Sequence, residues 1–166
     1  ADGNVAAATR VLEETLQVEP RQPLLQGELS ELYRRTGAWE SFTRVTLGAA
    51  READDADAKI AGIRAAAEAY VDKLHLPDAA IPLLEEALAL RPGDRITRSA
   101  LADALRAGGR TEEAKALLAA MLEEFGRRRP PERALVHYQL ARVARQEGRL
   151  DETLVQLDLA SNMDVS

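Results

Sequence analysis

The residue types that most often perform catalysis or hold a metal are few in this chain and are not suitably spaced. There is no cysteine, which excludes thiol nucleophiles and thiolate ligands, and the two histidines are His75 and His137. Neither histidine belongs to an HxxxH or HExxH pattern, so the sequence predicts no zinc site. Neighbouring glutamates such as Glu13-Glu14 point in different directions on a helix and do not converge as an acid–base pair. We therefore expect no catalytic residue, no metal, no cofactor and no enzymatic activity.

Three further positions have alternative interpretations. Gly108 to Thr111 (GGRT) has some likeness to a phosphate-binding loop, but the flanking glycine and lysine of that motif are missing and no strand precedes it. A turn between two helices is therefore predicted there. His75 is predicted to be a turn residue, at a place where glycine is usual. His137 is expected on the surface or in a groove, with a pH-sensitive contact as the alternative.

The charge distribution disfavours nucleic acid as a partner. The chain has 22 Lys and Arg against 28 Asp and Glu, a formal net charge of −6, which is unfavourable for general binding to nucleic acid. The basic run Arg127–Arg129 with Arg133 is interpreted as a solvated loop, and a docking site for an acidic partner is the alternative. We expect no membrane association, because no run of 18 apolar residues is present. No leader segment is visible, and a cytoplasmic location is expected, with the periplasm as the alternative.

The elements that carry these residues are predicted to be helices. The composition is rich in helix formers, with 31 Ala and 24 Leu against 7 Pro. Gly37, Gly109 and Gly148 fall where a helix ends in a residue with positive φ, and Asp94 and Thr111 are predicted N-caps. Apolar residues recur at spacings of three and four, which predicts helices over 4–18, 24–36, 39–53, 56–74, 77–91, 94–107, 111–125, 132–147 and 150–162.

The sequence also repeats itself. The segment Leu101–Leu122 aligns without gaps with Leu140–Ser161, and weaker copies cover Leu29–Ala50 and Ala66–Leu88. Each copy has a residue, usually small, near the start of its second half. This residue recurs at intervals of 34, 38, 34 and 39, at Ala8, Phe42, Ala80, Ala114 and Thr153.

This pattern resembles the tetratricopeptide repeat family, whose unit of about 34 residues is a helix–turn–helix. The third full copy carries it most clearly, with small Ala102 and Ala114, large Leu105 and the turn residue Gly109. The resemblance implies an all-α fold, a right-handed α-solenoid of antiparallel helix pairs with about nine helices in one array. The predicted division is a half repeat over 1–20 and full repeats over 21–54, 55–92, 93–128 and 129–166.

The repeat register and the composition give two expectations about origin. The register places Ala1 inside a repeat and Ser166 almost at a repeat boundary, so we expect a fragment of a longer array. Arginine exceeds lysine by 19 to 3, which together with abundant alanine suggests a bacterial genome. The first helix has an apolar side, at Val5, Ala8, Leu12 and Leu16, that is predicted to lack a neighbour and to allow self-association.

The resemblance further implies a concave groove that is lined by the first helix of each pair and holds peptide segments of partners. In the last pair, Tyr138, Arg142 and Arg145 stand without an acid at the lining positions, which predicts binding of a carboxylate or an acidic segment. The alternative is that these arginines pair only with acids of the adjacent repeat, such as Asp103. The predicted groove residues are Arg34, Arg35, Arg64, Ser99, Asp103, Arg106, Tyr138, Arg142 and Arg145.

The leading functional hypothesis is a non-catalytic scaffold segment of a larger repeat protein. Its groove would bind a partner peptide or protein by burial and by charge matching. One alternative is a structural self-assembly module, and another is a regulatory domain of a larger multidomain protein. Sequence-specific RNA recognition is disfavoured by the acidic charge and by the lack of a repeating base-reading pair.

Overall fold

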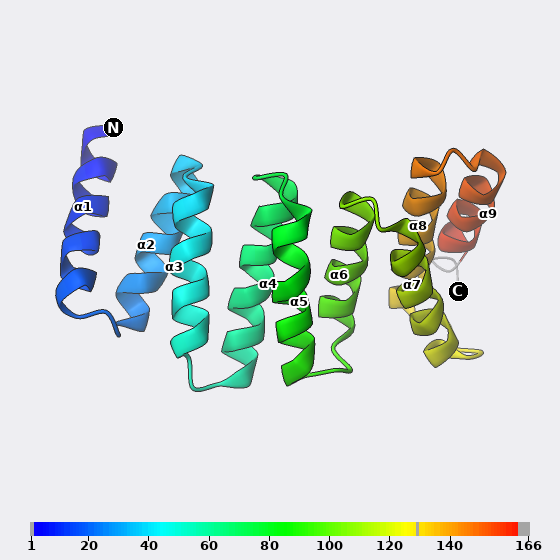
Figure 1. Ribbon diagram of the computed structural model, residues 1–166, viewed down its shortest axis with the longest axis horizontal. Helices are drawn as coiled ribbons and strands as arrows, with labels where there is room; N and C mark the ends of the chain where they lie inside the picture. The colour runs from blue at the N-terminus through cyan, green and yellow to red at the C-terminus, as the bar shows by residue number, and fades with distance from the viewer. Residues whose placement is uncertain (1, 129, 163–166) are drawn as a thin grey trace. The chain divides into compact units, whose positions relative to one another are not determined.

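The computed structural model describes residues 2–128 and 130–162, and these residues form nine helices and no strand. Figure 1 shows α2 with α3, α4 with α5, α6 with α7 and α8 with α9 as antiparallel pairs, with α1 before them. This confirms the predicted all-α fold of solenoid helix pairs, whereas the handedness stays a prediction. The helices are α1 (Asp2–Val18), α2 (Pro23–Thr36), α3 (Trp39–Glu52), α4 (Ala56–Asp72), α5 (Pro77–Leu90), α6 (Arg95–Ala107), α7 (Thr111–Phe125), α8 (Pro131–Gln146) and α9 (Leu150–Ser161).

The turns within the pairs follow the predicted chemistry. Gly37, Gly109 and Gly148 have φ of 74°, 78° and 75°, in the left-handed region that glycine adopts without steric cost. His75 occupies the equivalent turn between α4 and α5 with φ of 56°, which confirms its prediction as a turn residue. Helix α4 therefore ends at Asp72, two residues before the predicted end.

The two predicted N-caps have different outcomes. The Asp94 carboxylate accepts a hydrogen bond from the backbone N–H of Thr97 at 3.1 Å, so the prediction for Asp94 is confirmed. The prediction for Thr111 is wrong, because Thr111 is already the first helical residue of α7 and makes no cap. Its side chain instead forms a hydrogen bond that, together with those from Arg149 and Lys115, lowers the pKa of Glu147 to about 2.

The chain divides into two compact units, Ala1–Pro92 and Gly93–Ser166. In the first unit, Leu29 and Tyr33 of α2 and Phe42 of α3 form a buried cluster. Leu12 and Leu16 of α1 pack against this cluster. The prediction that this apolar side of the first helix lacks a neighbour is therefore wrong for Leu12 and Leu16, which α2 and α3 partly cover, whereas Ala8 is exposed. Self-association through this helix stays a prediction. The exposed large apolar residues of α1 are Val11 and Val18.

Most of the small residues that the repeat pattern singled out are buried between helices, although Ala8 is exposed. Ala67, Ala80 and Ala114 have no exposed surface, and Ala102 is 1% exposed. Small side chains let helix backbones approach closely, and larger neighbours such as Leu84 and Leu118 fill the remaining space. In the described part of the chain, no helix combines the length and the apolar run that crossing a bilayer requires.

Tyr33 supplies a prediction that tests the packing of α1 on α2. Its hydroxyl donates a hydrogen bond to Glu13 of α1, and the side chain is buried. Burial, followed by this bond to a carboxylate, raises the pKa of Tyr33 from 10.0 to about 12. We expect a titration of the protein, followed by the ultraviolet absorbance of tyrosinate, to show a step near pH 12 that Tyr33→Phe removes.

The same shift sets a direction for stability. The pKa of the Tyr33 phenol is higher in the folded state than in the unfolded state. The contribution of this group to the free energy of unfolding is therefore fully present below pH 10 and is lost as the pH rises towards 12. Tyr138→Phe is the matched control, since Tyr138 is 48% exposed, and it should leave the late step in place. A late step that persists in Tyr33→Phe would contradict the packing of α1 described above.

Candidate partner-binding surface

In the second compact unit, the first helix of each pair, α6 and α8, carries a stripe of partly or fully exposed residues. We call the two stripes together the α6–α8 surface, which consists of Ile96, Ser99, Asp103 and Arg106 on α6 and Leu135, Tyr138, Arg142 and Arg145 on α8. The spacings of three and four place each stripe along one face of its helix. Ile96, Leu135 and Tyr138 are 62%, 50% and 48% exposed, which is unusual for large apolar or aromatic side chains grouped on one surface.

Two glutamines of α8 hold this surface together. The Gln139 side-chain amide donates to the Ser99 carbonyl at 2.9 Å and accepts from the Ser99 hydroxyl at 2.9 Å. Gln146 makes the same two-way contact with Arg106, donating to its carbonyl at 3.0 Å and accepting from its guanidinium at 3.1 Å. Each pair is 40 residues apart, close to the repeat interval. Sequence reasoning missed Gln139, although this spacing is a signal that could have identified it.

The charges of the surface are only partly compensated. One oxygen of Asp103 accepts from Arg106 at 2.9 and 3.0 Å and lies 2.8 Å from the Arg142 guanidinium. For Arg142, the structure thus supports the alternative in which the arginines of the last pair bind acids of the adjacent repeat such as Asp103. Arg145 is exposed and forms no ion pair with any residue that the structure describes. Three arginines against one aspartate leave the surface positive.

The other predicted groove residues belong to the first compact unit. Arg34 is occupied within α2, where its guanidinium donates to both carboxylate oxygens of Glu31 at 2.7 and 2.8 Å. This contact lowers the pKa of Glu31. Arg35 is exposed on the same helix, and Arg64 is half-buried on α4. Of the nine predicted residues, the structure therefore brings Asp103, Arg106 and Arg142 into one set of polar contacts. Ser99 bonds separately to Gln139, and Tyr138 and Arg145 lie on the same face of α8.

The prediction that His137 lies on the surface or in a groove is wrong. The side chain is 5% exposed and faces α9, where Nδ1 lies 2.8 Å from the side-chain oxygen of Gln156. One helical step of about 100° separates His137 from the exposed Tyr138, so the two neighbours have opposite environments. Over residues 2–128 and 130–162, no three histidine or acidic residues are grouped so that they could hold a metal ion.

Arginines of the basic run bind backbone carbonyl groups at the end of α7 and just after it. The Arg133 guanidinium donates to the carbonyl oxygens of Gly126 and Arg128 at 2.9 and 3.0 Å, and Arg128 donates to the Glu124 carbonyl at 3.4 Å. Cations at a helix C-terminus are favoured by the helix dipole. These contacts support the interpretation of a solvated structural loop for Arg128 and Arg133. Arg129, the third residue of the run, lies outside the described residues.

The chain is similar to known proteins that contain tetratricopeptide repeats. A sequence model described as "Tetratricopeptide repeat" matches residues 75–130. Similar solved structures include MamA of MSR-1, which is 25% identical with a TM-score of 0.66 over 98% of this chain and 88% of that one. The TPR-like repeats of a kinesin light chain of Podosopora anserina are 20% identical, with a TM-score of 0.73 over 98% of this chain and 88% of that one.

A third similar structure is YrrB, described as a TPR protein with an unusual peptide-binding site. It is 19% identical, with a TM-score of 0.68 over 97% of this chain and 78% of that one. At such identities, the likeness to YrrB and to the kinesin light chain concerns the fold alone. Among curated protein sequences, none matches this chain.

Proposed function

Because the chain is a tetratricopeptide repeat protein, we propose that it binds a partner peptide or protein, with the α6–α8 surface as the binding site. Proteins of this family are generally non-catalytic scaffolds that bind other proteins. Binding here rests on buried apolar area and on charge matching, and no bond is made or broken. The wider groove of the sequence hypothesis, which also includes Arg34, Arg35 and Arg64, remains part of this proposal.

The observation that carries the proposal is that the α6–α8 surface changes along its helices, from apolar side chains at one end to arginines at the other. Ile96 and Leu135 lie near the starts of α6 and α8, and Arg106 and Arg145 lie in their last turns. Exposed large apolar side chains beside arginines are typical of protein-binding sites. We infer a partner segment with an apolar residue at one end and a carboxylate at the other.

Arg145 is the arginine of this surface best placed to receive that carboxylate. Arg106 and Arg142 already donate to Asp103, so a partner carboxylate near them would have to share their donors with it. Arg145 is exposed and lies in the same stripe as Tyr138. A guanidinium binds a carboxylate through two parallel hydrogen bonds, and tyrosine adds apolar area and one hydroxyl.

A display library of random peptides, selected against the immobilised protein, tests this proposal. We expect the enriched peptides to contain Asp, Glu or a free C-terminus next to an apolar residue. Arg145→Glu should weaken binding of the best peptide by about tenfold to a hundredfold, since a charge-assisted hydrogen bond is replaced by repulsion. Arg127→Glu reverses the charge of an exposed arginine just after the end of α7 and is the matched control. Equal effects of the two variants, or enrichment of basic peptides that Arg145→Glu does not affect, would refute the site.

A further inference from the structure

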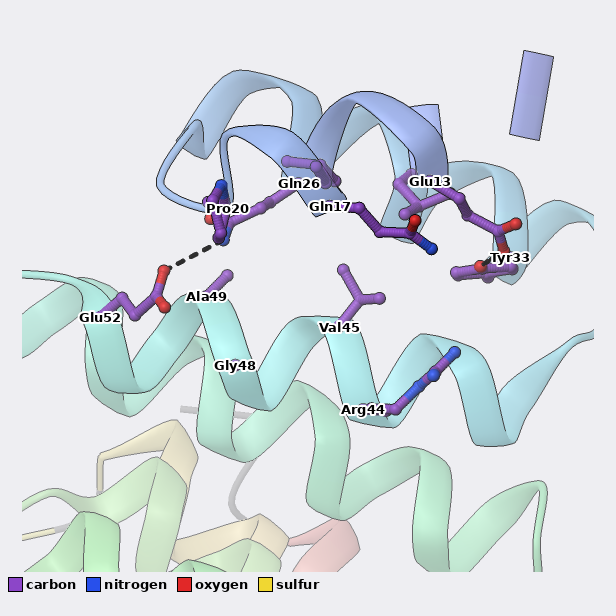
Figure 2. Close-up of a pocket in the computed structure, with 12 residues that line it drawn as sticks. Glu13, Gln17, Pro20, Gln26, Tyr33, Arg44, Val45, Gly48, Ala49 and Glu52 are labelled. Carbon is purple, nitrogen blue, oxygen red and sulfur yellow. Dashed lines mark hydrogen bonds between the residues drawn. The ribbon is translucent and has the colours of Figure 1, made fainter. Parts of the chain in front are cut away.

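The first compact unit contains a second concave feature, a cleft of about 470 Å³ between α1, α2 and α3. Its apolar lining consists of Leu16 of α1, Leu29 of α2, and Val45 and Ala49 of α3. Figure 2 shows Gln17 and Gln26 on one side of it and Val45, Gly48 and Ala49 of α3 on the other. The volume is within the range of about 300–1,000 Å³ that is usual for ligand sites. We call this feature the α1–α3 cleft.

Each end of the α1–α3 cleft carries a carboxylate that accepts a hydrogen bond from a neutral group. At one end Tyr33 donates to Glu13, and at the other the Gln26 amide donates to Glu52 at 3.2 Å, as Figure 2 shows. Both donors are neutral groups, and neither carboxylate forms an ion pair within the described residues. Arg44 lies on the side of Glu13 and Tyr33, which leaves the Glu52 end as the more negative one.

The backbone around Glu52 adds to this negative character. Glu52 is the last residue of α3, α1 ends nearby at Val18, and α2 begins at the same end with Pro23, so two helix C-termini and one helix N-terminus lie here. Arg51, the basic residue in the last turn of α3, is paired with Glu86 at 3.3 Å. Helix C-termini carry partial negative charge on their unpaired carbonyl groups. The Pro20 carbonyl, which accepts from Gln26 at 2.8 Å, faces the same end. A cation is therefore the natural complement of this end of the cleft.

Gly48 keeps the α3 wall of the cleft open. A Cβ atom built on Gly48 meets no other atom within 4 Å, so the space beside it is available without any movement of the backbone. Gly48 lies within α3 and its φ is not positive, which means that other residues fit its conformation. The position thus offers a way to fill the cleft without disturbing the fold.

We propose that the α1–α3 cleft binds a basic, apolar peptide segment of a partner protein, which places one lysine or arginine side chain in it. The aliphatic part of that side chain lies over Leu16, Leu29 and Val45, and its charged end lies beside Glu52. Lysine and arginine combine a long apolar stem with a terminal charge, which is the pattern that this cleft presents in complementary form. The net charge of −6 also attracts a basic partner.

This site is independent of the proposed function, because it is built from α1, α2 and α3 and selects the opposite charge. The probe is an acetylated pentapeptide amide, Ala-Leu-Lys-Leu-Ala, titrated into the isotope-labelled protein and followed by the chemical shifts of backbone amides. We expect the amides of Gly48 and Ala49 and those of the last turn of α1 to shift. The matched peptide with glutamate in place of lysine should produce no such shifts.

Three variants identify the site. Gly48→Leu fills the cleft and should abolish the shifts, whereas Gly48→Ala adds one methyl group and should keep the affinity within about twofold. Glu52→Gln keeps an acceptor for Gln26 but removes the charge, and should weaken the lysine peptide about fivefold. Equal shifts with both peptides, shifts confined to other helices, or Gly48→Leu binding as well as Gly48→Ala would overturn the proposal. Arg145→Glu should leave this binding unchanged, so the failure of one site is distinguishable from the failure of the other.

Discussion

Leu118→Ala is expected to lower the free energy of unfolding by about 2–5 kcal/mol. Leu118 lies in α7 and has no exposed surface. Its truncation removes buried methyl groups and leaves a cavity that fixed neighbouring helices cannot fully close. Because small domains have a total stability of about 5–15 kcal/mol, this change is a large fraction of it. Urea unfolding followed by circular dichroism measures the loss.

Leu154→Ala is the matched control for this experiment. Leu154 lies in α9 of the same compact unit and is 67% exposed, so its truncation should change the stability by less than about 0.5 kcal/mol. Hydrogen exchange of the Leu118→Ala variant should show the largest loss of protection in α6 to α9, because stacked repeats depend on contacts with immediate neighbours. Equal destabilisation by the two variants would contradict the packing of α7 in this fold.

The helices and turns were predictable because their signals are local. Apolar residues that recur three or four positions apart indicate which positions share a helix face. The turn positions require positive φ whichever residue occupies them. His75 illustrates the second point, since the register alone predicted its turn although glycine is absent. Burial of Ala80 and Ala114 followed from the same register.

The burial and the hydrogen-bond partners of individual polar side chains were less predictable, because they depend on which neighbouring helix faces them. His137 and Tyr138 are adjacent and were both expected at an accessible surface, yet α9 covers only His137. The bond between Gln139 and Ser99 requires two helices from different repeats to stand in register within a few tenths of an ångström. For Arg142 and Arg145, the sequence left open whether they bind a partner carboxylate or pair with an acid of the adjacent repeat. The contact with Asp103 assigns Arg142 to the second alternative and does not include Arg145.

The packing around the glycines inside helices was also not predictable from the sequence. In the sequence, Gly48 and Gly62 are alike, each lying inside a predicted helix with an alanine on one side and a larger apolar residue on the other. In the structure, Gly48 borders open space in the α1–α3 cleft, whereas Gly62 of α4 lies directly against Ala50 of α3. A Cβ atom on Gly62 would be 2.6 Å from the Ala50 Cβ, a distance that real side chains do not reach. Only the spacing of the helices in three dimensions separates the two cases.

Gly62→Ala and Gly48→Ala are therefore expected to change stability in opposite directions. In a helix interior, alanine is favoured over glycine by about 0.5–1 kcal/mol, and Gly48→Ala should gain this amount because nothing opposes the new methyl group. Gly62→Ala gains the same propensity but forces α3 and α4 apart, at a cost of about 1–3 kcal/mol for overpacking. We expect Gly62→Ala to melt at a lower temperature than the parent protein and Gly48→Ala at a higher one. If Gly62→Ala stabilised the protein as much as Gly48→Ala, then α3 and α4 would not be in contact at Ala50.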